Sequence, residues 1–220
     1  MDVILKNSIN EKVHFVNNSG LQIFLKREDK MHNIISGNKY RKLKFNLIKA
    51  KELGFKGLLT FGGAYSNHIP AVAYAAKKNG FKSLGFIRGE EIVNNYLENP
   101  TLKYSHDLGM KFNFLSRSNY KLKTNEYYLT KLKKEFKDYY FIPEGGTNAL
   151  GVLGCQEILN DNDKEFDYIC CSVGTGGTIC GLINSSNENQ KIIGFSSINK
   201  NYLLNDITKF VTNENWMVVD

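Results

Sequence analysis

The stretch GLLTFGGAYSNHIPAVAYAAKKNG, residues 57–80, contains one complete strand–loop–helix unit. Its first five residues form a short apolar run, which predicts a buried strand, and residues 62–68 form a loop of glycine and small polar side chains. Pro70 falls in the first turn of the predicted helix and Gly80 follows its end, which are the positions that proline and glycine favour. The unit therefore predicts a strand followed by the helix that covers it.

The same alternation continues on both sides of this unit. Further strands are expected within LQIFLKRED (21–29), at 83–87, 111–115, 139–143 and 166–173, and within KIIGFSS (191–197). Helices are expected at 38–53, 96–108, 125–137 and 151–160, and after the glycine-rich loop at 174–178. This order predicts an α/β fold with parallel sheets covered by helices on both faces.

Ligands of such sheets bind at the carboxyl ends of the strands. That rule selects three loops, Ser66–His68, Glu144–Thr147 and Gly174–Thr178, all rich in small polar residues.

The composition limits the class of protein. With 220 residues and 42% hydrophobic residues, the chain can form a real core. The net charge of +7 is spread from Lys6 to Lys209 with acidic residues interspersed, which argues against nucleic acid as a partner. No apolar segment approaches a membrane span and no leader is evident, so we expect a cytoplasmic protein without membrane contact.

The four cysteines, Cys155, Cys170, Cys171 and Cys180, form no C-x-x-C pair. We therefore expect buried free thiols and no metal site.

The basic stretch SGNKYRKLKFNLIKAKELG, residues 36–54, allows three interpretations: a solvated basic helix, a polyanion-binding patch, or a helix that places one lysine for chemistry. Asn38 is the expected helix cap and Gly54 the expected stop. Lys39 lies at the positive end of the helix dipole, close to Arg41 and Lys42. Positive surroundings and desolvation favour the neutral amine that a Schiff-base lysine needs.

The segment SVGTGGTICG, residues 172–181, follows an apolar strand and opens a helix, which predicts an anion-binding loop. Thr175 and Thr178 add hydroxyl donors. The loop has no Walker lysine, and Ile179 stands where a dinucleotide fingerprint requires its third glycine. A monophosphate is the expected ligand, and a glycine-rich turn without any ligand is the alternative.

In GGAYSNH, Ser66, Asn67 and the nearby amides suit a carboxylate or a ring oxygen, and His68 suits the lining of a pocket. A plain turn between strand and helix is the alternative here.

Five segments, in this order, resemble the 1-aminocyclopropane-1-carboxylate deaminase / D-cysteine desulfhydrase family, pyridoxal-phosphate enzymes of the tryptophan-synthase-beta type (fold type II). They are KRED, SGNKYRKLK, LLTFGGAYSNH, IPEGGTNALGVLG and DYICCSVGTGGT, and together they extend over nearly the whole chain.

The resemblance implies a role for each matching residue. Lys39 would form the internal aldimine with pyridoxal 5′-phosphate and act as the base when a β-leaving group is eliminated. Asn67 would bond the ring's 3-hydroxyl oxygen, and Ser66, with the amides of Asn67 and His68, would hold the substrate carboxylate. Lys42 would lie near the phosphate or brace the site. The phosphate would be held by Gly174, Thr175, Gly176, Gly177 and Thr178.

The implied activity is that of a lyase or deaminase on a small amino acid. A β-leaving group such as a thiol would be eliminated to give pyruvate and ammonia, whereas an aminocyclopropane acid would undergo ring opening. The residues do not choose between D-cysteine, another β-substituted amino acid and the cyclopropane substrate.

The resemblance also implies a domain organisation. A small α/β domain at 43–140 would be inserted in a large cofactor domain formed by 1–42 and 141–220. Family members continue beyond this chain, so the large domain is expected to lack its C-terminal part, with the tyrosine near the cofactor and the partner of the pyridine nitrogen. One alternative is an inactive remnant or a non-catalytic cofactor-binding protein. Another is a nucleotide-binding module, which the segment GTGGT and the positive charge suggest. A homodimer is a possible assembly.

Overall fold

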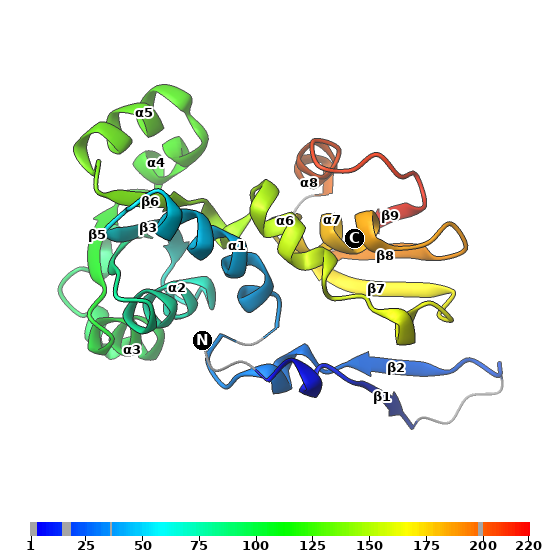
Figure 1. The fold of residues 1–220 in the computed structure, drawn as a ribbon. Helices are drawn as coiled ribbons and strands as arrows, with labels where there is room; N and C mark the ends of the chain where they lie inside the picture. Colours follow the sequence, from blue (N-terminus) through cyan, green and yellow to red (C-terminus); the bar gives the residue numbers. More distant parts are fainter. Residues whose placement is uncertain (1–3, 15–18, 36, 198–199) are drawn as a thin grey trace.

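The computed structural model describes residues 4–14, 19–35, 37–197 and 200–220, with the backbone alone for 200–202. Ser36, which begins the basic stretch, lies outside the described residues. The described chain forms two parallel sheets and an antiparallel hairpin, and helices α1 (Asn38–Glu52) and α6 (Ala149–Gln156) lie between the two parallel sheets (Figure 1).

The larger sheet has the strand order β5-β4-β3-β6, with all neighbours parallel. Its strands are β3 (Gly57–Gly63), β4 (Lys82–Arg88), β5 (Lys111–Leu115) and β6 (Tyr139–Ile142). Helices α2 (His68–Lys78) and α3 (Pro100–Asp107) cover one face, and α4 (Arg117–Tyr120) and α5 (Glu126–Glu135) cover the other. The predicted strands at 57–61, 83–87, 111–115 and 139–143 are thus confirmed.

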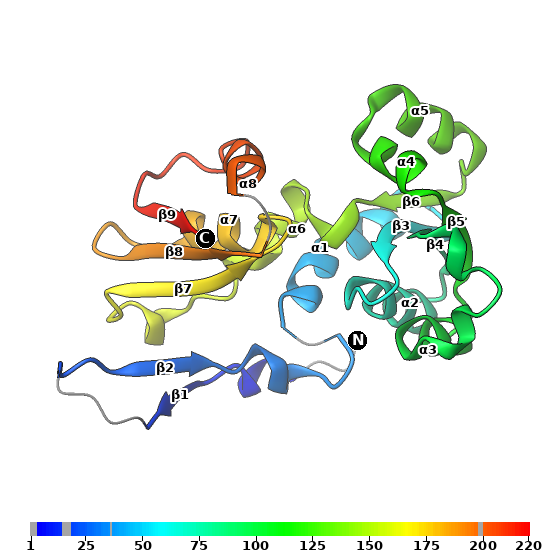
Figure 2. The ribbon, with the colours of Figure 1, turned by 180° about the vertical axis from the view of Figure 1, so that it is seen from behind.

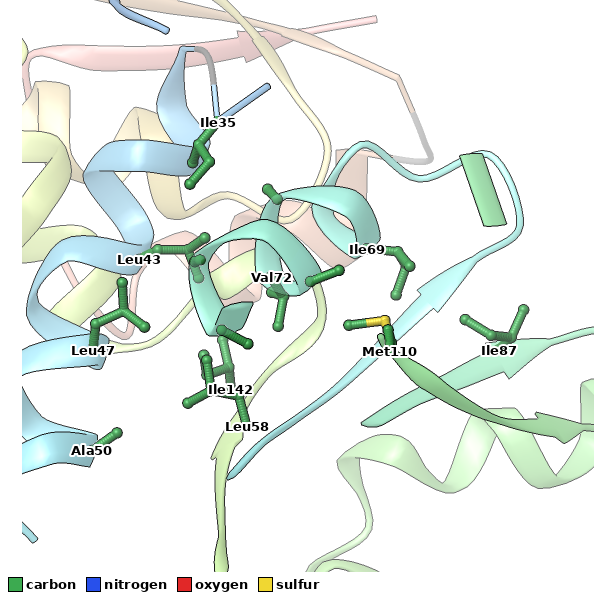
Figure 3. Close-up of a cluster of buried hydrophobic side chains, with 14 of the residues drawn as sticks. Ile35, Leu43, Leu47, Ala50, Leu58, Ile69, Val72, Ile87, Met110 and Ile142 are labelled. Carbon is green, nitrogen blue, oxygen red and sulfur yellow. The ribbon is translucent and has the colours of Figure 1, made fainter. Parts of the chain in front are cut away.

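Residues of β3 alternate between two buried clusters. Leu58 packs with Val72 of α2, Leu43 and Leu47 of α1, and Ile142 of β6 (Figure 3). The next residue, Leu59, belongs to the cluster on the opposite face. The two central strands, β3 and β4, are buried on both faces, which explains why their interiors carry no charged residue.

The smaller parallel sheet has the order β7-β8-β9, from β7 (Tyr168–Val173), β8 (Lys191–Ser196) and β9 (Trp216–Val219). Helices α6, α7 (Gly177–Ser185) and α8 (Lys200–Ile207) cover one face of it. The other face leaves large apolar side chains in solvent, with Tyr168 61% and Phe195 50% exposed. The apolar strand expected at 166–173 is present, but the expectation that helices cover both faces of the sheet is wrong for this strand, whose residues alternate between a covered and an uncovered face.

The thiol expectation is corrected for the same reason. Cys155 and Cys180 are buried between the helices, as expected, but Cys170 points to the uncovered face of β7 and is exposed.

The hairpin consists of β1 (Asn10–Val13) and β2 (Ile23–Lys26), which pair antiparallel. It lies below the smaller sheet in both views (Figures 1 and 2). Short 3-10 turns complete the described chain: η1 (Leu5–Asn7), η2 (Glu28–Met31), η3 (Glu90–Ile92), η4 (Tyr96–Glu98), η5 (Lys121–Thr124), η6 (Glu144–Gly146) and η7 (Asp161–Asp163).

Two helix starts differ from expectation. The cap of α1 is Gly37, whose φ of +60° is readily available only to glycine, and Asn38 is the first helical residue. The single helix expected at 96–108 is divided, because Pro100 lacks an N–H group and begins a new helix that Asn99 caps. Gly54 follows α1 with φ +72°, as expected of a stop.

The predicted domain limits at 42/43 and 140/141 remain a prediction. Among the described helices, none is both long and apolar enough to cross a membrane.

Candidate cofactor site

A cavity of about 310 Å³ lies where the N-terminus of α1 meets the carboxyl end of β7. Seven of the predicted site residues line it: Lys39, Lys42, Ser66, Gly174, Thr175, Gly176 and Thr178. Further lining comes from Asn38, Glu144, Gly145, Ser172 and Ser197, among others. Residues from all three loops that the topology rule selected therefore line one cavity.

Lys39 is buried, with 9% of its surface exposed. This burial, together with the neighbouring charge of Lys42, lowers the pKa of Lys39 to about 7. A lysine is ordinarily protonated at neutral pH, so this shift makes a large fraction of neutral, nucleophilic amine available. The basic helix is therefore not simply a solvated face, although Lys49 and Lys51 are exposed on its last turn.

Lys42 lies one turn further along α1 and is almost completely buried. Its Nζ lies 3.3 Å from the hydroxyl of Thr147 and 3.5 Å from that of Thr175, and these two hydroxyls are 2.6 Å apart. In the described part of the chain no carboxylate pairs with this ammonium, and burial lowers its pKa. A buried cation with only hydroxyl partners favours the binding of an anion.

The glycine-rich loop supplies the rest of an anion cradle, which we define as residues 174–178 with Lys42 and Thr147. Gly176 adopts φ +80° immediately before α7, so the N-terminus of that helix faces the cavity. A Cβ atom on Gly177 would lie 2.8 Å from the hydroxyl of Thr147 and 3.1 Å from Lys42 Nζ. Only glycine allows these groups to approach the loop so closely.

The loop before α2 is divided between cavity and core. Ser66 lines the cavity, and its hydroxyl accepts a hydrogen bond of 3.3 Å from the amide of His68. The side chain of His68 does not line the cavity, contrary to expectation. It is buried against Thr60, 2.8 Å from the hydroxyl, and burial lowers its pKa well below the ordinary value. Asn67 is exposed, and neither it nor Gly177 is among the lining residues.

Several residues at the site had no individual role predicted from the sequence. Asn38, expected only as a cap, donates a 2.7 Å hydrogen bond to the hydroxyl of Thr178. Thr147 contacts Lys42, and Glu144 lines the cavity. Glu144 and Thr147 lie in a loop that the topology rule selected, and that rule was the only indication in the sequence that they belong to the site.

The fold and this site define a class of protein. The chain belongs to the family of pyridoxal-phosphate-dependent enzymes, whose sequence profile matches residues 11–209. This confirms the fold class expected from the sequence.

Within that family, the chain resembles 1-aminocyclopropane-1-carboxylate deaminases and D-cysteine desulfhydrases. It is 34% identical over 206 residues to a putative 1-aminocyclopropane-1-carboxylate deaminase of Thermotoga maritima, a match that includes 88% of this chain and 64% of the relative. It is 31% identical over 176 residues to a D-cysteine desulfhydrase of Serratia proteamaculans, a match that includes 74% of this chain and 52% of the relative.

Solved structures agree with this result. The structure of a homologue of that deaminase, 27% identical, superposes with a TM-score of 0.71 and includes 90% of this chain and 66% of the other. A serine racemase of Dictyostelium discoideum, 19% identical with a TM-score of 0.62, shares the fold. The chain thus spans between about half and two thirds of the length of these relatives.

Proposed function

We propose that this protein is a pyridoxal-phosphate-dependent lyase or deaminase that acts on a small amino acid, with D-cysteine and 1-aminocyclopropane-1-carboxylate as the first candidates. The observation that carries the proposal is the presence, in one cavity, of a lysine whose pKa lies near 7 and an anion cradle with a buried cation. The substrate class comes from the relatives, a putative 1-aminocyclopropane-1-carboxylate deaminase and a D-cysteine desulfhydrase.

The residues present fit the cofactor. Lys42 and the amides at the start of α7 would hold its phosphate, with the hydroxyls of Thr175 and Thr178 as further donors. Lys39 would bind its aldehyde carbon. A cavity of about 310 Å³ lies in the range of small-molecule sites.

When bound, pyridoxal phosphate supplies an electron sink for charge that develops at the substrate's α-carbon. With a β-substituted amino acid such as D-cysteine, Lys39 Nζ would take the α-proton, which a group with a pKa near 7 can both accept and return. The cyclopropane acid has no α-proton, so its reaction would begin with opening of the ring instead. Ser66 and the adjacent amides would hold the substrate carboxylate, which fixes the α-carbon relative to Lys39.

The buried His68 is excluded as the base by its contacts. Its ring lies against Thr60 in the sheet, outside the cavity lining, and its pKa is far below the ordinary value. The proposal also includes the binding roles given above to Asn67, Gly177 and the amide of His68. It further includes a cytoplasmic location and a homodimeric assembly.

The test begins with the visible absorption spectrum of the purified chain after addition of pyridoxal phosphate. We expect a protein-bound cofactor band that Lys39→Ala abolishes and Lys51→Ala, an exposed lysine of the same helix, retains. Sulfide and pyruvate from D-cysteine, or ammonia from the cyclopropane acid, would then identify the reaction.

Absence of the band in a folded chain would contradict the proposal. A Lys39-dependent band without turnover of either substrate would instead support the alternative, a cofactor-binding protein without catalysis.

A further inference from the structure

Lys39 and Lys42 occupy positions i and i+3 of α1, where helical side chains are neighbours. Both line the same cavity and both are buried, with 9% and 2% of their surfaces exposed. Two amines this close in a poorly solvated site titrate as a pair, because a proton on one disfavours a proton on the other.

Among the described residues, no carboxylate forms an ion pair with either lysine of this pair. The thiols of Cys171 and Cys180 near Lys42 are neutral at pH 7, because burial raises the pKa of each to about 12. From α6, the Cys155 thiol has its pKa raised by burial to about 11, so it is neutral at pH 7. From α2, His68 is also neutral, because burial lowers its pKa. Glu144 lines the cavity from η6, but its carboxylate accepts a 2.5 Å hydrogen bond from Tyr120 and pairs with Lys123 at 3.4 Å.

The anion cradle is therefore the place from which a negative charge would act on both lysines. Lys42 is part of the cradle through Thr147 and Thr175, and Lys39 lies one turn away on the same helix. An anion held there would favour the protonated forms, since an opposite charge within about 4–6 Å stabilises the charged state.

We propose that the cradle binds free phosphate-type dianions when the cofactor is absent, and that this binding drives proton uptake by the Lys39–Lys42 pair. Free phosphate would then convert Lys39 from its nucleophilic form to its charged form and protect it from small electrophiles. The inference rests on the role of the cradle in the proposed function and adds a coupling between the two lysines.

The experiment is competitive labelling of the cofactor-free protein with trace acetic anhydride between pH 6 and 9.5, with the modified lysines identified by mass spectrometry. Only the neutral amine attacks the anhydride, with loss of acetate and of the amine proton, so labelling follows the neutral fraction of Lys39. The samples contain inorganic phosphate or chloride at the same ionic strength. Phosphate binding is measured separately by ³¹P line broadening.

We expect phosphate to raise the midpoint of Lys39 labelling by about one pH unit. Lys42→Met keeps the length and burial of the side chain without its charge, and this variant should lose most of the phosphate effect. Lys51→Met, the same change on an exposed turn of α1, should retain it.

Two results would overturn the inference, and they differ in what else they affect. If phosphate binds and the midpoint of Lys39 does not move, the coupling is wrong and the proposed function is unaffected. If phosphate does not bind, the cradle has been misassigned and the proposed function loses its phosphate site as well.

Discussion

The side-chain amide of Asn38 donates a 2.7 Å hydrogen bond to the hydroxyl of Thr178, so the first turn of α1 is joined to the first turn of α7. Asn38 precedes Lys39, and Thr178 belongs to the anion cradle. Thr178 also forms a side-chain hydrogen bond with Cys155 of α6, so this hydroxyl connects α1, α6 and α7. The bond from Asn38 thus fixes the start of α1, which carries Lys39, against the anion cradle.

We predict that Asn38→Ala weakens the binding of pyridoxal phosphate about five- to tenfold, since a hydrogen bond contributes about 1 kcal/mol. The dissociation constant is measured by absorbance titration. Thr178→Val should cause a similar loss, and the double variant should lose little more than either single variant. Additive losses would show that the two side chains act independently.

A second prediction concerns Lys39 and the pH dependence of stability. Its pKa is about 7 in the folded protein, against an ordinary lysine value of about 10.4 in the unfolded chain. Between these values the unfolded chain binds more protons, so Lys39 makes the free energy of unfolding rise with pH. Below pH 7 Lys39 lowers the free energy of unfolding by its full amount.

Lys39→Met removes this effect, and we expect the variant to be more stable than the parent at pH 7 by about 2 kcal/mol or more. Its advantage should shrink as the pH approaches 9.5. Urea unfolding at pH 7, 8.5 and 9.5 measures the difference in free energy of unfolding between variant and parent. Lys51→Met is the control, and it should leave the pH dependence of the free energy of unfolding unchanged. An advantage that is constant with pH would contradict the shifted pKa.

Much of the fold could be predicted from local patterns, because apolar runs bounded by glycine mark the strands of a sheet that is buried on both faces. The same reasoning failed for β7, where FDYICCSV is equally apolar but one face is uncovered. Composition does not say whether another element covers a strand. Strand β1, with the sequence NEKV, has no apolar pattern to detect and is largely exposed.

The site could be predicted as three loops but not as a set of contacts. The topology rule selected the loops of Ser66 and Glu144, which follow β3 and β6 at one edge of the larger sheet, and the loop of Gly174, which follows β7 of the smaller sheet. The rule does not say that the ends of two separate sheets meet. The bonds from Asn38 to Thr178 and from Lys42 to Thr147 join residues 140 and 105 positions apart, which no local pattern reports. His68 was misplaced because the first turn of α2 directs its ring at Thr60 of the sheet.

A third prediction tests the packing that positions α1. A Cβ atom on Gly154 of α6 would lie 1.9 Å from the carbonyl oxygen of Arg41. Alanine is favoured over glycine in a helix by about 1 kcal/mol, but a contact with backbone at this distance cannot be relieved by a rotamer change.

We therefore expect Gly154→Ala to lower the free energy of unfolding, by about 2 kcal/mol, and to weaken cofactor binding because α1 carries Lys39 and Lys42. Leu153→Ala, a change at the adjacent and 43% exposed position, should cost less than about 1 kcal/mol and leave binding unchanged. A stabilised Gly154→Ala protein would show that α1 and α6 can separate without cost.

The last prediction concerns the attachment of the hairpin through Asp163, which is 3% exposed. Its two carboxylate oxygens accept hydrogen bonds from Asn10 of β1 at 2.9 Å and from Lys26 of β2 at 2.5 Å. Breaking such a buried pair leaves one charge without compensation, which costs about 3 kcal/mol. Asp163→Ala should therefore destabilise the protein by that amount and make the hairpin sensitive to limited proteolysis.

Asp161 in the same turn is the matched control. It is 90% exposed and pairs with Lys164 at 2.7 Å, so Asp161→Ala should change the free energy of unfolding by less than about 0.5 kcal/mol. Phe24 packs against Phe166 with ring centroids 5.1 Å apart, which is a second attachment of the hairpin. Unchanged proteolysis in Asp163→Ala would mean that this aromatic contact alone holds the hairpin in place.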